Sequence, residues 1–563
     1  MKLLSQASLL GLPLVVNALA YDYIIILRGR NSVFVPGLIG AGQALTTLNW
    51  AYTTVPQTHL NGRVLTINAG KALGGSTVIN SMIFPRAEKA QYDAWGTLNN
   101  DSSWTWNTLL PYFKKSEIFT PPNKFQQANG ARFERDVHGF NEEQGRVKVG
   151  FPNFFFQQWS LWRQTAMRLG FPASPDLGNG SPHAVGVAPA SSIDPDNNTR
   201  CSAACAYYTD FADRPNFTTE QGRESVITAS DVEYINANNE TQVVNVSHGG
   251  EVIVSAGTIG THKVLELSGV GNSSILQAAG VKPILDLPSV GENFAGKAQL
   301  AQRSSVDVIV LSQIMLIAGI TNDLLLLDPT FAEQQLNLWF ENRTGFYSFV
   351  SRSLGIAAPS DIFNKSELNR LLQESEEKLN YFAALLSNGN PLLARGIQAQ
   401  HRLALDLYRS NKNLPLEMSL RPSFFGNTSF EDRPARAYNT VVSALYAPLS
   451  RGRTHISSSD PFVPPMIDPA YWTHPLDVAF HAAGIKLARK MLTTGPMASI
   501  YEGEFEPGLD KVTDEDIENW LRGVVQSYTH EVGTMAMLPQ GLCGVVDTKL
   551  RIYGLKNVRV AGM

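Results

Sequence analysis

Cysteine is scarce in this sequence: only Cys201, Cys205 and Cys543 occur among 563 residues. Three cysteines exclude a disulfide framework, and at least one thiol has no partner within the chain. Cys201 and Cys205 could pair, but an i,i+4 spacing is equally typical of two small buried side chains. No Cys/His spacing matches a zinc site, so we expect no metal centre.

A marked excess of charge is also missing. The chain has 46 Lys and Arg against 50 Asp and Glu, for a net charge of −4. This balance provides no basic field for nucleic acid or for an anionic membrane. Residues 308–320 are apolar but fall short of the roughly 20 residues of a membrane span, so we expect a core element there. No G-x-S-x-G elbow supports a serine hydrolase.

What is present is an ordinary globular composition, with 44% apolar and 17% charged residues. A chain of this length exceeds one hydrophobic core, so we expect two or more domains. Residues 1–20 are predicted to be a signal peptide. Lys2 supplies the positive start, residues 3–16 are mostly apolar, and residues 18–20 read Ala-Leu-Ala. A buried N-terminal helix is the alternative interpretation.

Nine N-x-S/T sequons agree with secretion, because glycosylated asparagines lie on the surface of secreted proteins. We therefore expect a secreted, extracellular glycoprotein. The asparagines expected at its surface are Asn100, Asn197, Asn216, Asn239, Asn245, Asn272, Asn342, Asn364 and Asn427.

Strand and helix patterns alternate toward both ends of the chain. Residues 21–27 and 251–255 are β-rich apolar runs, typical of buried parallel strands. Residues 475–492 have an amphipathic helical pattern, and residues 514–523 form a further expected helix. This order predicts a discontinuous α/β nucleotide-binding domain wrapped around a second, α+β domain.

The first motif with chemical content is the run GKALGGSTVINSMI at residues 70–83. Gly74 and Gly75 let the backbone approach a ligand closely, since neither residue has a Cβ. Ser76 and Thr77 can cap a helix whose N–H groups face an anion. A plain tight turn before a helix has about equal weight as an interpretation.

The second motif, SAGTIGTHKVLELSGVG, covers residues 255–271. It predicts a strand, a turn at Gly257 and a helix over residues 261–268, which is the order of a dinucleotide fold. His262 is expected at the surface of that helix rather than as a ligand.

The third motif begins at His530 and reads HEVGTMAM, followed by GVVD at residues 544–547 and LRIYG at residues 550–554. A lone histidine is more often an ordinary core or surface residue than a catalytic one. His530 differs because of this ordered set of neighbours. His455, within the run PLSRGRTHI at residues 448–456, is expected to be structural.

In their order, these motifs resemble the signatures of the glucose–methanol–choline (GMC) oxidoreductase family. The resemblance implies an α/β FAD-binding domain with a parallel, Rossmann-like sheet, and an α+β substrate domain built on an antiparallel sheet. It makes His530 the catalytic base, because a neutral imidazole can accept the hydroxyl proton while a hydride passes to flavin N5. It places FAD beside Gly74, Gly75, Ser76, Asn80, Ser81 and Gly257.

The resemblance also implies the partners: a small-molecule alcohol or sugar as substrate, and oxygen or a quinone as acceptor. No nucleic acid or membrane partner is expected. Ile79 stands where some relatives carry a linking histidine, so we expect non-covalent FAD. The expected segments are a signal peptide (1–20), three FAD-binding parts (21–119, 201–300 and 501–563), a lid or connecting part (120–200) and the substrate domain (301–500).

The sequence departs from the family pattern in two places. No G-x-G-x-x-G fingerprint follows Ile26, and family-like sequence resumes at Val33, although a βαβ unit takes roughly 30 residues. The printed sequence stops at Met563, before the second His or Asn of the catalytic pair. We therefore expect an incomplete FAD-binding domain, truncated in its third part. The competing hypothesis is a catalytically inactive or non-flavin secreted glycoprotein derived from this family.

Overall fold

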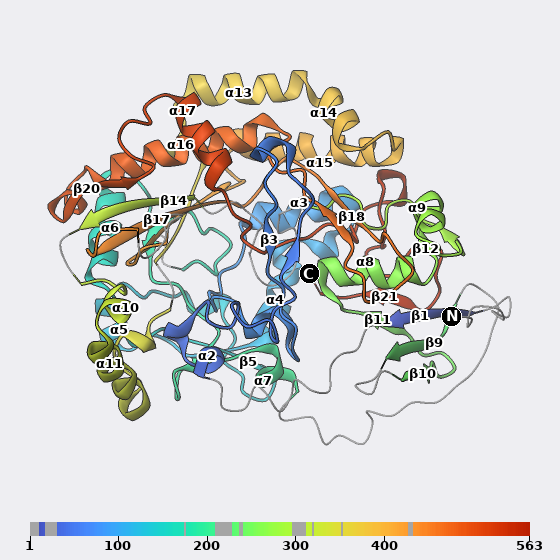
Figure 1. Cartoon of the computed structure of the whole chain (residues 1–563), viewed down its shortest axis with the longest axis horizontal. Helices are drawn as coiled ribbons and strands as arrows, with labels where there is room; N and C mark the ends of the chain where they lie inside the picture. Colours follow the sequence, from blue (N-terminus) through green and yellow to red (C-terminus); the bar gives the residue numbers. More distant parts are fainter. Residues whose placement is uncertain are drawn as a thin grey trace.

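The largest sheet in the described part of the chain has six strands, and every neighbouring pair is antiparallel (Figure 1). The structure is a computed structural model that describes residues 11–16, 31–173, 176–208, 228–235, 240–295, 311–317, 320–350, 353–425 and 432–562. In spatial order the strands are β20 (Tyr501–Glu506), β14 (Leu311–Ile317), β17 (Tyr438–Leu445), β16 (Leu416–Arg421), β15 (Leu354–Ala357) and β6 (Ala184–Val187).

Helices cover this sheet, and strands β15, β16 and β17 are buried along nearly their whole length. All residues of β17 are buried, and α6 (Gln157–Arg168) and α16 (Pro475–Leu492) pack against the sheet. Leu416 and Met418 of β16 share one core with Trp162 and Met491 of these helices. Burial of each such side chain contributes roughly 1.5–3 kcal/mol. Residues 311–317 of the predicted apolar core element form β14, which pairs with β17 on one side and β20 on the other.

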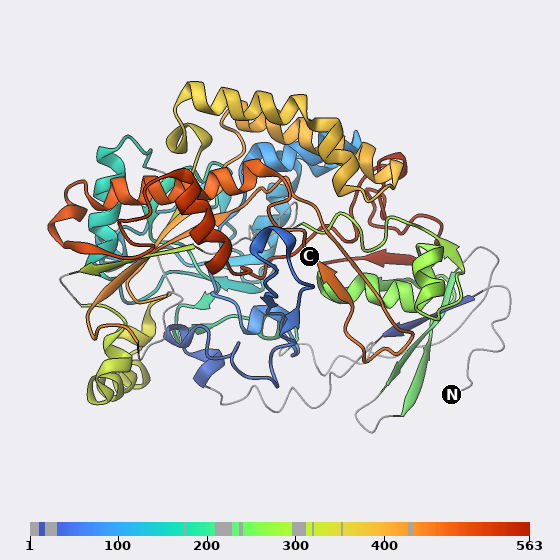
Figure 2. The ribbon, with the colours of Figure 1, turned by 45° about the horizontal axis from the view of Figure 1, so that its top comes forward.

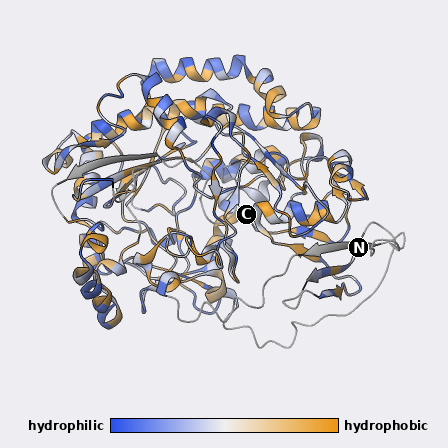
Figure 3. Ribbon diagram, in the orientation of Figure 1, coloured by the Kyte–Doolittle hydropathy of each residue, from blue (hydrophilic) through white to orange (hydrophobic). Residues whose placement is uncertain are grey.

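A further layer of helices lies above the sheet in the view of Figure 1. It contains α13 (Lys365–Glu377), α14 (Leu379–Leu386), α15 (Pro391–Arg409) and α17 (Asp514–Val524). Figure 3 shows α13 as mostly hydrophilic, and its buried apolar side chains are Leu368 and Leu372, four residues apart. This spacing places both on one face of the helix. The helices predicted at residues 475–492 and 514–523 are confirmed as α16 and α17.

Parallel strand pairs gather at the other end of the molecule, where β1, β9 and β10 lie together in Figures 1 and 2. Strand β1 (Gly11–Val16) pairs with β9 (Thr228–Ile235), and β10 (Thr241–Asn245) runs antiparallel to β9. Strand β11 (Val252–Val254) pairs in parallel with β21 (Val558–Val560), and β12 (Val270–Gly271) pairs in parallel with β13 (Leu285–Asp286).

Segments far apart in the sequence build this second region. Val254 of β11, Leu265 of α8 (Gly257–Leu267) and Val558 of β21 belong to one buried apolar cluster. An α/β region with parallel strands therefore stands beside a region built on an antiparallel sheet, as the sequence predicts.

Strand β1 falls inside the segment predicted to be a signal peptide, and in the whole chain it pairs with β9. Removal of residues 1–20 stays a prediction. The strand expected at residues 21–27, and the chain directly after Ile26 where the glycine fingerprint is missing, lie outside the described residues.

The remaining elements connect these two regions. They are α2 (Asn31–Phe34), β2 (Tyr52–Thr53), β3 (Thr66–Ile67), α3 (Lys89–Asn99), α4 (Trp106–Ser116), β4 (Glu117–Phe119), α5 (Lys124–Ala128), β5 (Val147–Val149), β7 (Ile193–Asp194), β8 (Thr199–Arg200), α7 (Ala203–Tyr207), α9 (Ser273–Ala278), α10 (Leu324–Leu327), α11 (Pro329–Asn342), α12 (Pro359–Ile362), β18 (Arg453–His455) and β19 (Met466–Asp468). Over the described residues, no helix is both long and apolar enough to cross a membrane.

The sequon asparagines that the structure describes lie at the surface, as expected. Asn100, Asn197, Asn342 and Asn364 are exposed, and Asn245 and Asn272 are half-buried. Asn216, Asn239 and Asn427 lie outside the described residues. Glycosylation itself stays a prediction.

Candidate functional site

The first glycine motif follows β3 and turns sharply into a short 3-10 helix at Gly75–Val78. Gly74 has a φ of 93°, and a Cβ there would lie 2.9 Å from the amide nitrogen of Ala204. A Cβ at Gly70 would lie 2.3 Å from the carbonyl oxygen of Gly75. The turn therefore needs glycine at both positions for its own packing.

Gly75 differs from these two because no atom lies within 4 Å of the position its Cβ would occupy. Its φ of 55° is again in the left-handed region. Ser76 beside it is exposed, and the Ser76 hydroxyl accepts a hydrogen bond of 3.0 Å from the Gly70 amide. Gly75 and Ser76 thus form the open rim of the turn, where a ligand can approach the backbone.

Asn80 is held in place by donors on either side of it. Its Oδ1 accepts a hydrogen bond of 2.6 Å from Nη1 of Arg200 and one of 3.0 Å from the amide of Met82. Arg200 is buried and also donates from Nε to the carbonyl oxygen of Val33 at 2.8 Å. These bonds fix the side-chain amide of Asn80 with its oxygen toward Arg200. Ser81 is half-buried next to it.

The second motif starts where β11 ends, at exposed Ser255 and Ala256, and continues into α8. The helix begins at Gly257, four residues earlier than the sequence pattern predicts. Gly257 has a φ of 74°, and the position of its missing Cβ is open to 4 Å. Ala256 caps the helix without a side-chain hydrogen bond. The first N–H groups of α8 therefore form a typical site for an anionic group.

The third motif is bound directly to the start of α8. Thr258 donates its hydroxyl to the carbonyl oxygen of Glu531 at 2.5 Å, and Thr534 donates its hydroxyl to the carbonyl oxygen of Thr258 at 2.7 Å. These two bonds hold Glu531 and Thr534, which follow His530, against Thr258 at the start of α8. Gly257 and His530, predicted from motifs far apart in the sequence, are therefore brought to one place.

The turn at residues 291–295 supports the same segment from its other side. Ala295 and Val532 exchange two backbone hydrogen bonds of 2.9 Å. Gly533 has a φ of 101°, and a Cβ there would lie 2.1 Å from the carbonyl oxygen of Asn293. Glycine is required at residue 533 for this close approach.

One buried apolar cluster lies beside the three motifs. Ile67 precedes the first glycine turn, Ile259 lies in the first turn of α8, and Phe294 lies in the turn that pairs with the His530 segment. The predicted residues Gly74, Gly75, Ser76, Asn80 and Ser81 lie together at residues 74–81, and this cluster packs the chain before them against the first turn of α8 and the turn at residues 291–295.

His530 itself is half-buried, and its imidazole meets the ring of Tyr528 edge-on at 4.8 Å between centroids. The Tyr528 hydroxyl donates to the carboxylate of Glu417 on β16 at 3.3 Å. Glu417 is fully buried and also accepts hydrogen bonds from the hydroxyls of Ser419 and Tyr446. The His530 segment thus contacts the antiparallel sheet as well as α8.

Sequence reasoning missed Glu417, Tyr446 and Tyr528. The signal for Glu417 was a carboxylate in the apolar strand LEMSL, since an ionised side chain is rarely buried without partners. Thr529, between Tyr528 and His530, has a φ of 63°. This conformation is strained for a β-branched residue, and such strain is frequent at functional sites.

The prediction that His262 lies on the surface of its helix is wrong. His262 is fully buried, and its Nδ1 lies 3.4 Å from Oε2 of Glu266, one turn further along α8. Strand β18 covers this face and brings His455 to 2.7 Å from Oε1 of Glu266 and 3.2 Å from Oε1 of Glu292. Burial lowers the pKa of His262 more than the bond to Glu266 raises it.

In His455, burial changes the pKa less than the two carboxylate partners together do, which is the reverse of the balance in His262. Burial favours the neutral imidazole, but hydrogen bonds to Glu266 and Glu292 outweigh it and raise the pKa of His455 to about 9. His455 is therefore an imidazolium between two carboxylates at neutral pH. It joins α8 to the chain segment of β18, which supports the structural role predicted for it.

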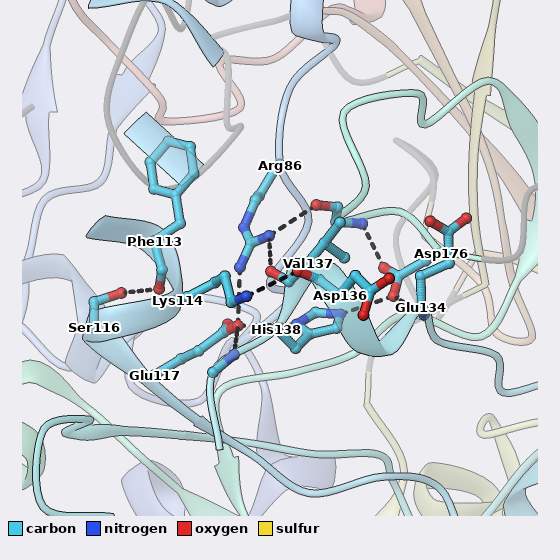
Figure 4. Close-up of polar contacts among 12 residues, drawn as sticks. Arg86, Phe113, Lys114, Ser116, Glu117, Glu134, Asp136, Val137, His138 and Asp176 are labelled. Atoms are coloured by element: carbon cyan, nitrogen blue, oxygen red, sulfur yellow. Dashed lines mark hydrogen bonds and ion pairs between the residues drawn. The ribbon is translucent and has the colours of Figure 1, made fainter. Parts of the chain in front are cut away.

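Arg86, three residues after the first motif, lies in a second buried ionic cluster (Figure 4). Its Nη2 is 2.9 Å from Oε1 of Glu117, and its Nη1 donates to the carbonyl oxygen of Val137 at 2.6 Å. His138 bridges Glu117 at 2.9 Å and Asp176 at 2.7 Å. Burial lowers the pKa of His138, but the bonds to Asp176 and Glu117 outweigh it, so the pKa is raised. Arg86 thus fixes the chain between the first motif and β4.

Comparison with known proteins places these motifs in one family. Two family models, both described as GMC oxidoreductase, match residues 24–298 and 448–563. The chain is 31% identical to a glucose oxidase-like protein of Humicola fuscoatra, over 94% of this chain and 84% of that protein. It is 28% identical to pyranose dehydrogenase 3 of Leucoagaricus meleagris, over 93% and 80%.

A solved structure supports the same relationship. An FAD-dependent oxidoreductase from Chaetomium thermophilum superposes with a TM-score of 0.83 at 28% sequence identity. The match covers 97% of this chain and 89% of that one.

Proposed function

Because this chain belongs to the GMC oxidoreductase family, a family of FAD-dependent oxidases and dehydrogenases of alcohols and sugars, we propose that it oxidises a CH–OH donor with His530 as base. The observation that carries this proposal is the pair of hydrogen bonds between Thr258 and the residues after His530. They hold a candidate base at the N-terminus of a helix suited to an anionic cofactor.

The residues around this point fit the cofactor that the family uses. Gly257 and Gly75 both leave open the space of a Cβ, and the first turn of α8 has no side-chain cap. The backbone N–H groups of α8 would hold a phosphate oxygen, and Gly74, Gly75, Ser76, Asn80 and Ser81 would lie along the flavin. Bound FAD would supply an acceptor for the hydride from the donor carbon.

His530 would take the hydroxyl proton of the donor. Its half-buried position beside Tyr528 leaves part of the imidazole accessible, and a base of this kind contributes about 10²- to 10⁴-fold in rate. Glu417 would act on His530 through Tyr528, by holding the phenol that packs against the imidazole.

The finer assignments follow the same reasoning. Ile79 is buried against Val33, Leu48 and Val78, and an alkyl side chain has no nucleophile for a flavin linkage, so FAD would be bound non-covalently. The donor would be a small alcohol or sugar, and the acceptor oxygen or a quinone. The nine sequons and the apolar N-terminus support a secreted, extracellular glycoprotein.

Turnover measurements with a matched histidine control test the catalytic role. The parent chain, His530→Ala and His248→Ala would be assayed with alcohols and aldoses, using oxygen and a quinone as acceptors. His248 is exposed and lies outside the motifs, so its variant should match the parent. His530→Ala should lose about 10²- to 10⁴-fold in kcat while it keeps its flavin spectrum. Equal rates for the two variants would refute His530 as the base.

A further inference from the structure

Two thiols lie close together behind the first glycine turn. The Sγ atoms of Cys201 and Cys205 are 3.7 Å apart, and neither residue is in a disulfide. A disulfide needs about 2.05 Å between its sulfur atoms, so closing this pair requires the two sulfur atoms to approach by about 1.65 Å.

The surroundings give the two thiols different roles. Cys205 is exposed on α7, whereas Cys201 is 1% exposed and its sulfur accepts a hydrogen bond from the Lys148 amide at 3.3 Å. The hydrogen bond to Asp194, then the charges of Asp194 and Asp196 and last that of Cys205, raise the pKa of Lys148 against the effect of burial. Because it is exposed, Cys205 is the thiol that an oxidant in solution reaches first.

Cys543 provides an internal contrast. It is buried, and burial raises the pKa of its thiol to about 12. A buried thiol with such a pKa is inert toward oxidants.

Helix α7, which carries Cys205, is bound to the glycine turn. The Ala203 amide donates to the Thr77 hydroxyl at 2.8 Å, and that hydroxyl donates to the carbonyl oxygen of Gly74 at 2.6 Å. The amide nitrogen of Ala204 lies 2.9 Å from the position a Cβ would take at Gly74. Because so little clearance exists, a constraint on α7 is transmitted to the turn.

We propose that Cys201 and Cys205 form a redox-active dithiol that hydrogen peroxide closes into a disulfide, and that the closed bridge restrains the glycine turn at residues 74–78. The Cys205 thiol releases its proton, its thiolate attacks one peroxide oxygen, and the O–O bond breaks to give a sulfenic acid and hydroxide, which takes up the released proton and becomes water. The Cys201 thiol then attacks the Cys205 sulfur, the S–S bond forms, and the hydroxyl leaves with the thiol proton as a second water. The two thiols together lose two electrons and two protons, which the peroxide takes up. This chemistry needs no bound FAD, so its failure is distinct from failure of the proposed function.

Thiol mapping by mass spectrometry tests the bridge. The reduced full chain would be treated with hydrogen peroxide, unfolded, alkylated with N-ethylmaleimide and digested with trypsin. Because Arg200 precedes Cys201, both thiols fall in one tryptic peptide. That peptide should escape alkylation and weigh two hydrogen atoms less than its reduced form, and dithiothreitol should reverse both changes. Cys543 should stay alkylated throughout. Persistent alkylation of Cys201 and Cys205, or added oxygen on Cys205 with Cys201 still alkylated, would overturn the proposal.

Two cysteine variants and hydrogen exchange test the link to the turn. Cys205→Ser should leave Cys201 open to alkylation after peroxide, whereas Cys543→Ser should form the bridge like the parent. Amide exchange at residues 74–78 should slow severalfold in the bridged parent and stay unchanged in peroxide-treated Cys205→Ser. A bridge that forms without any change in this exchange would refute the restraint on the turn.

Discussion

Replacement of His455 by Gln probes the buried ionic cluster that joins α8 to β18. In the parent, the imidazolium lies 2.7 Å from Glu266 and 3.2 Å from Glu292. Glutamine keeps a hydrogen-bond donor but stays neutral at every pH. It leaves buried Glu266 without its imidazolium, while Glu292 keeps Arg453 at 4.0 Å, so His455→Gln should be strongly destabilised near neutral pH.

The magnitude follows from the pKa of His455, which rises from 6.5 to about 9 on folding. At about 1.4 kcal/mol per pH unit, this rise corresponds to about 3 kcal/mol of unfolding free energy. A raised pKa means that the folded state binds the proton more tightly than the unfolded state. The stabilisation is therefore complete below pH 6.5 and is lost as the pH rises through 9.

The neighbouring titratable groups do not reverse the direction of this pH dependence of the unfolding free energy. Burial opposes ionisation of Glu266, but hydrogen bonds from His262 and His455 outweigh it and lower the pKa of Glu266, which is ionised throughout this range. Burial lowers the pKa of His262, which stays neutral there. His138 also has a raised pKa, but it is present in both proteins and cancels in their difference.

Urea unfolding of the parent and His455→Gln at pH 6.5 and pH 9 measures this contribution. The difference in unfolding free energy should shrink by about 3 kcal/mol between the two pH values. The exposed variant His248→Gln should match the parent at both. A His455→Gln deficit that stays the same at pH 6.5 and pH 9 would show that His455 is not held as an imidazolium.

Two further substitutions and one flavin-release measurement test other parts of the account. Gly533→Ala places a Cβ 2.1 Å from the Asn293 carbonyl oxygen at a φ of 101°, so it should lower the unfolding free energy by about 2–5 kcal/mol and weaken flavin binding. The control Gly541→Ala, where no atom lies within 4 Å of the new Cβ, should leave both properties unchanged. Thermal unfolding and flavin absorbance measure the two effects. His481 is fully buried, neither ring nitrogen has a hydrogen-bond partner among the described residues, and burial lowers its pKa to about 3. His481→Leu should therefore raise the unfolding free energy by about 1–3 kcal/mol, and a lower unfolding free energy would contradict this. Acid precipitation should release all flavin into the supernatant, and colour kept in the pellet would disprove non-covalent binding.

Local pattern predicted much of the fold. The helical period of residues 475–492 yields α16 with the same bounds, and the apolar run around Leu311–Ile317 yields strand β14. The three motifs were readable because glycine, serine and threonine at fixed spacings carry backbone requirements that do not depend on distant residues. Gly75 is such a residue, since its φ of 55° restricts the choice of side chain and no atom lies within 4 Å of its missing Cβ.

Contacts between distant segments were not predictable in this way. Glu417 and Tyr528 are 111 residues apart and meet only because β16 lies beside the segment that precedes His530. His262 was expected at the surface because one helix period does not reveal that β18 covers its face. Its i,i+4 partner Glu266 was the available sign of a buried pair, and the third member, His455, lies 189 residues from Glu266.

The central claim is that this chain binds FAD where the glycine turn, α8 and the His530 segment meet. The most direct measurement is the visible absorbance spectrum of the purified, folded chain before and after addition of an alcohol or an aldose. The account predicts a flavin spectrum that bleaches when the donor is added. A soluble, folded and colourless protein that takes up no added FAD would contradict it.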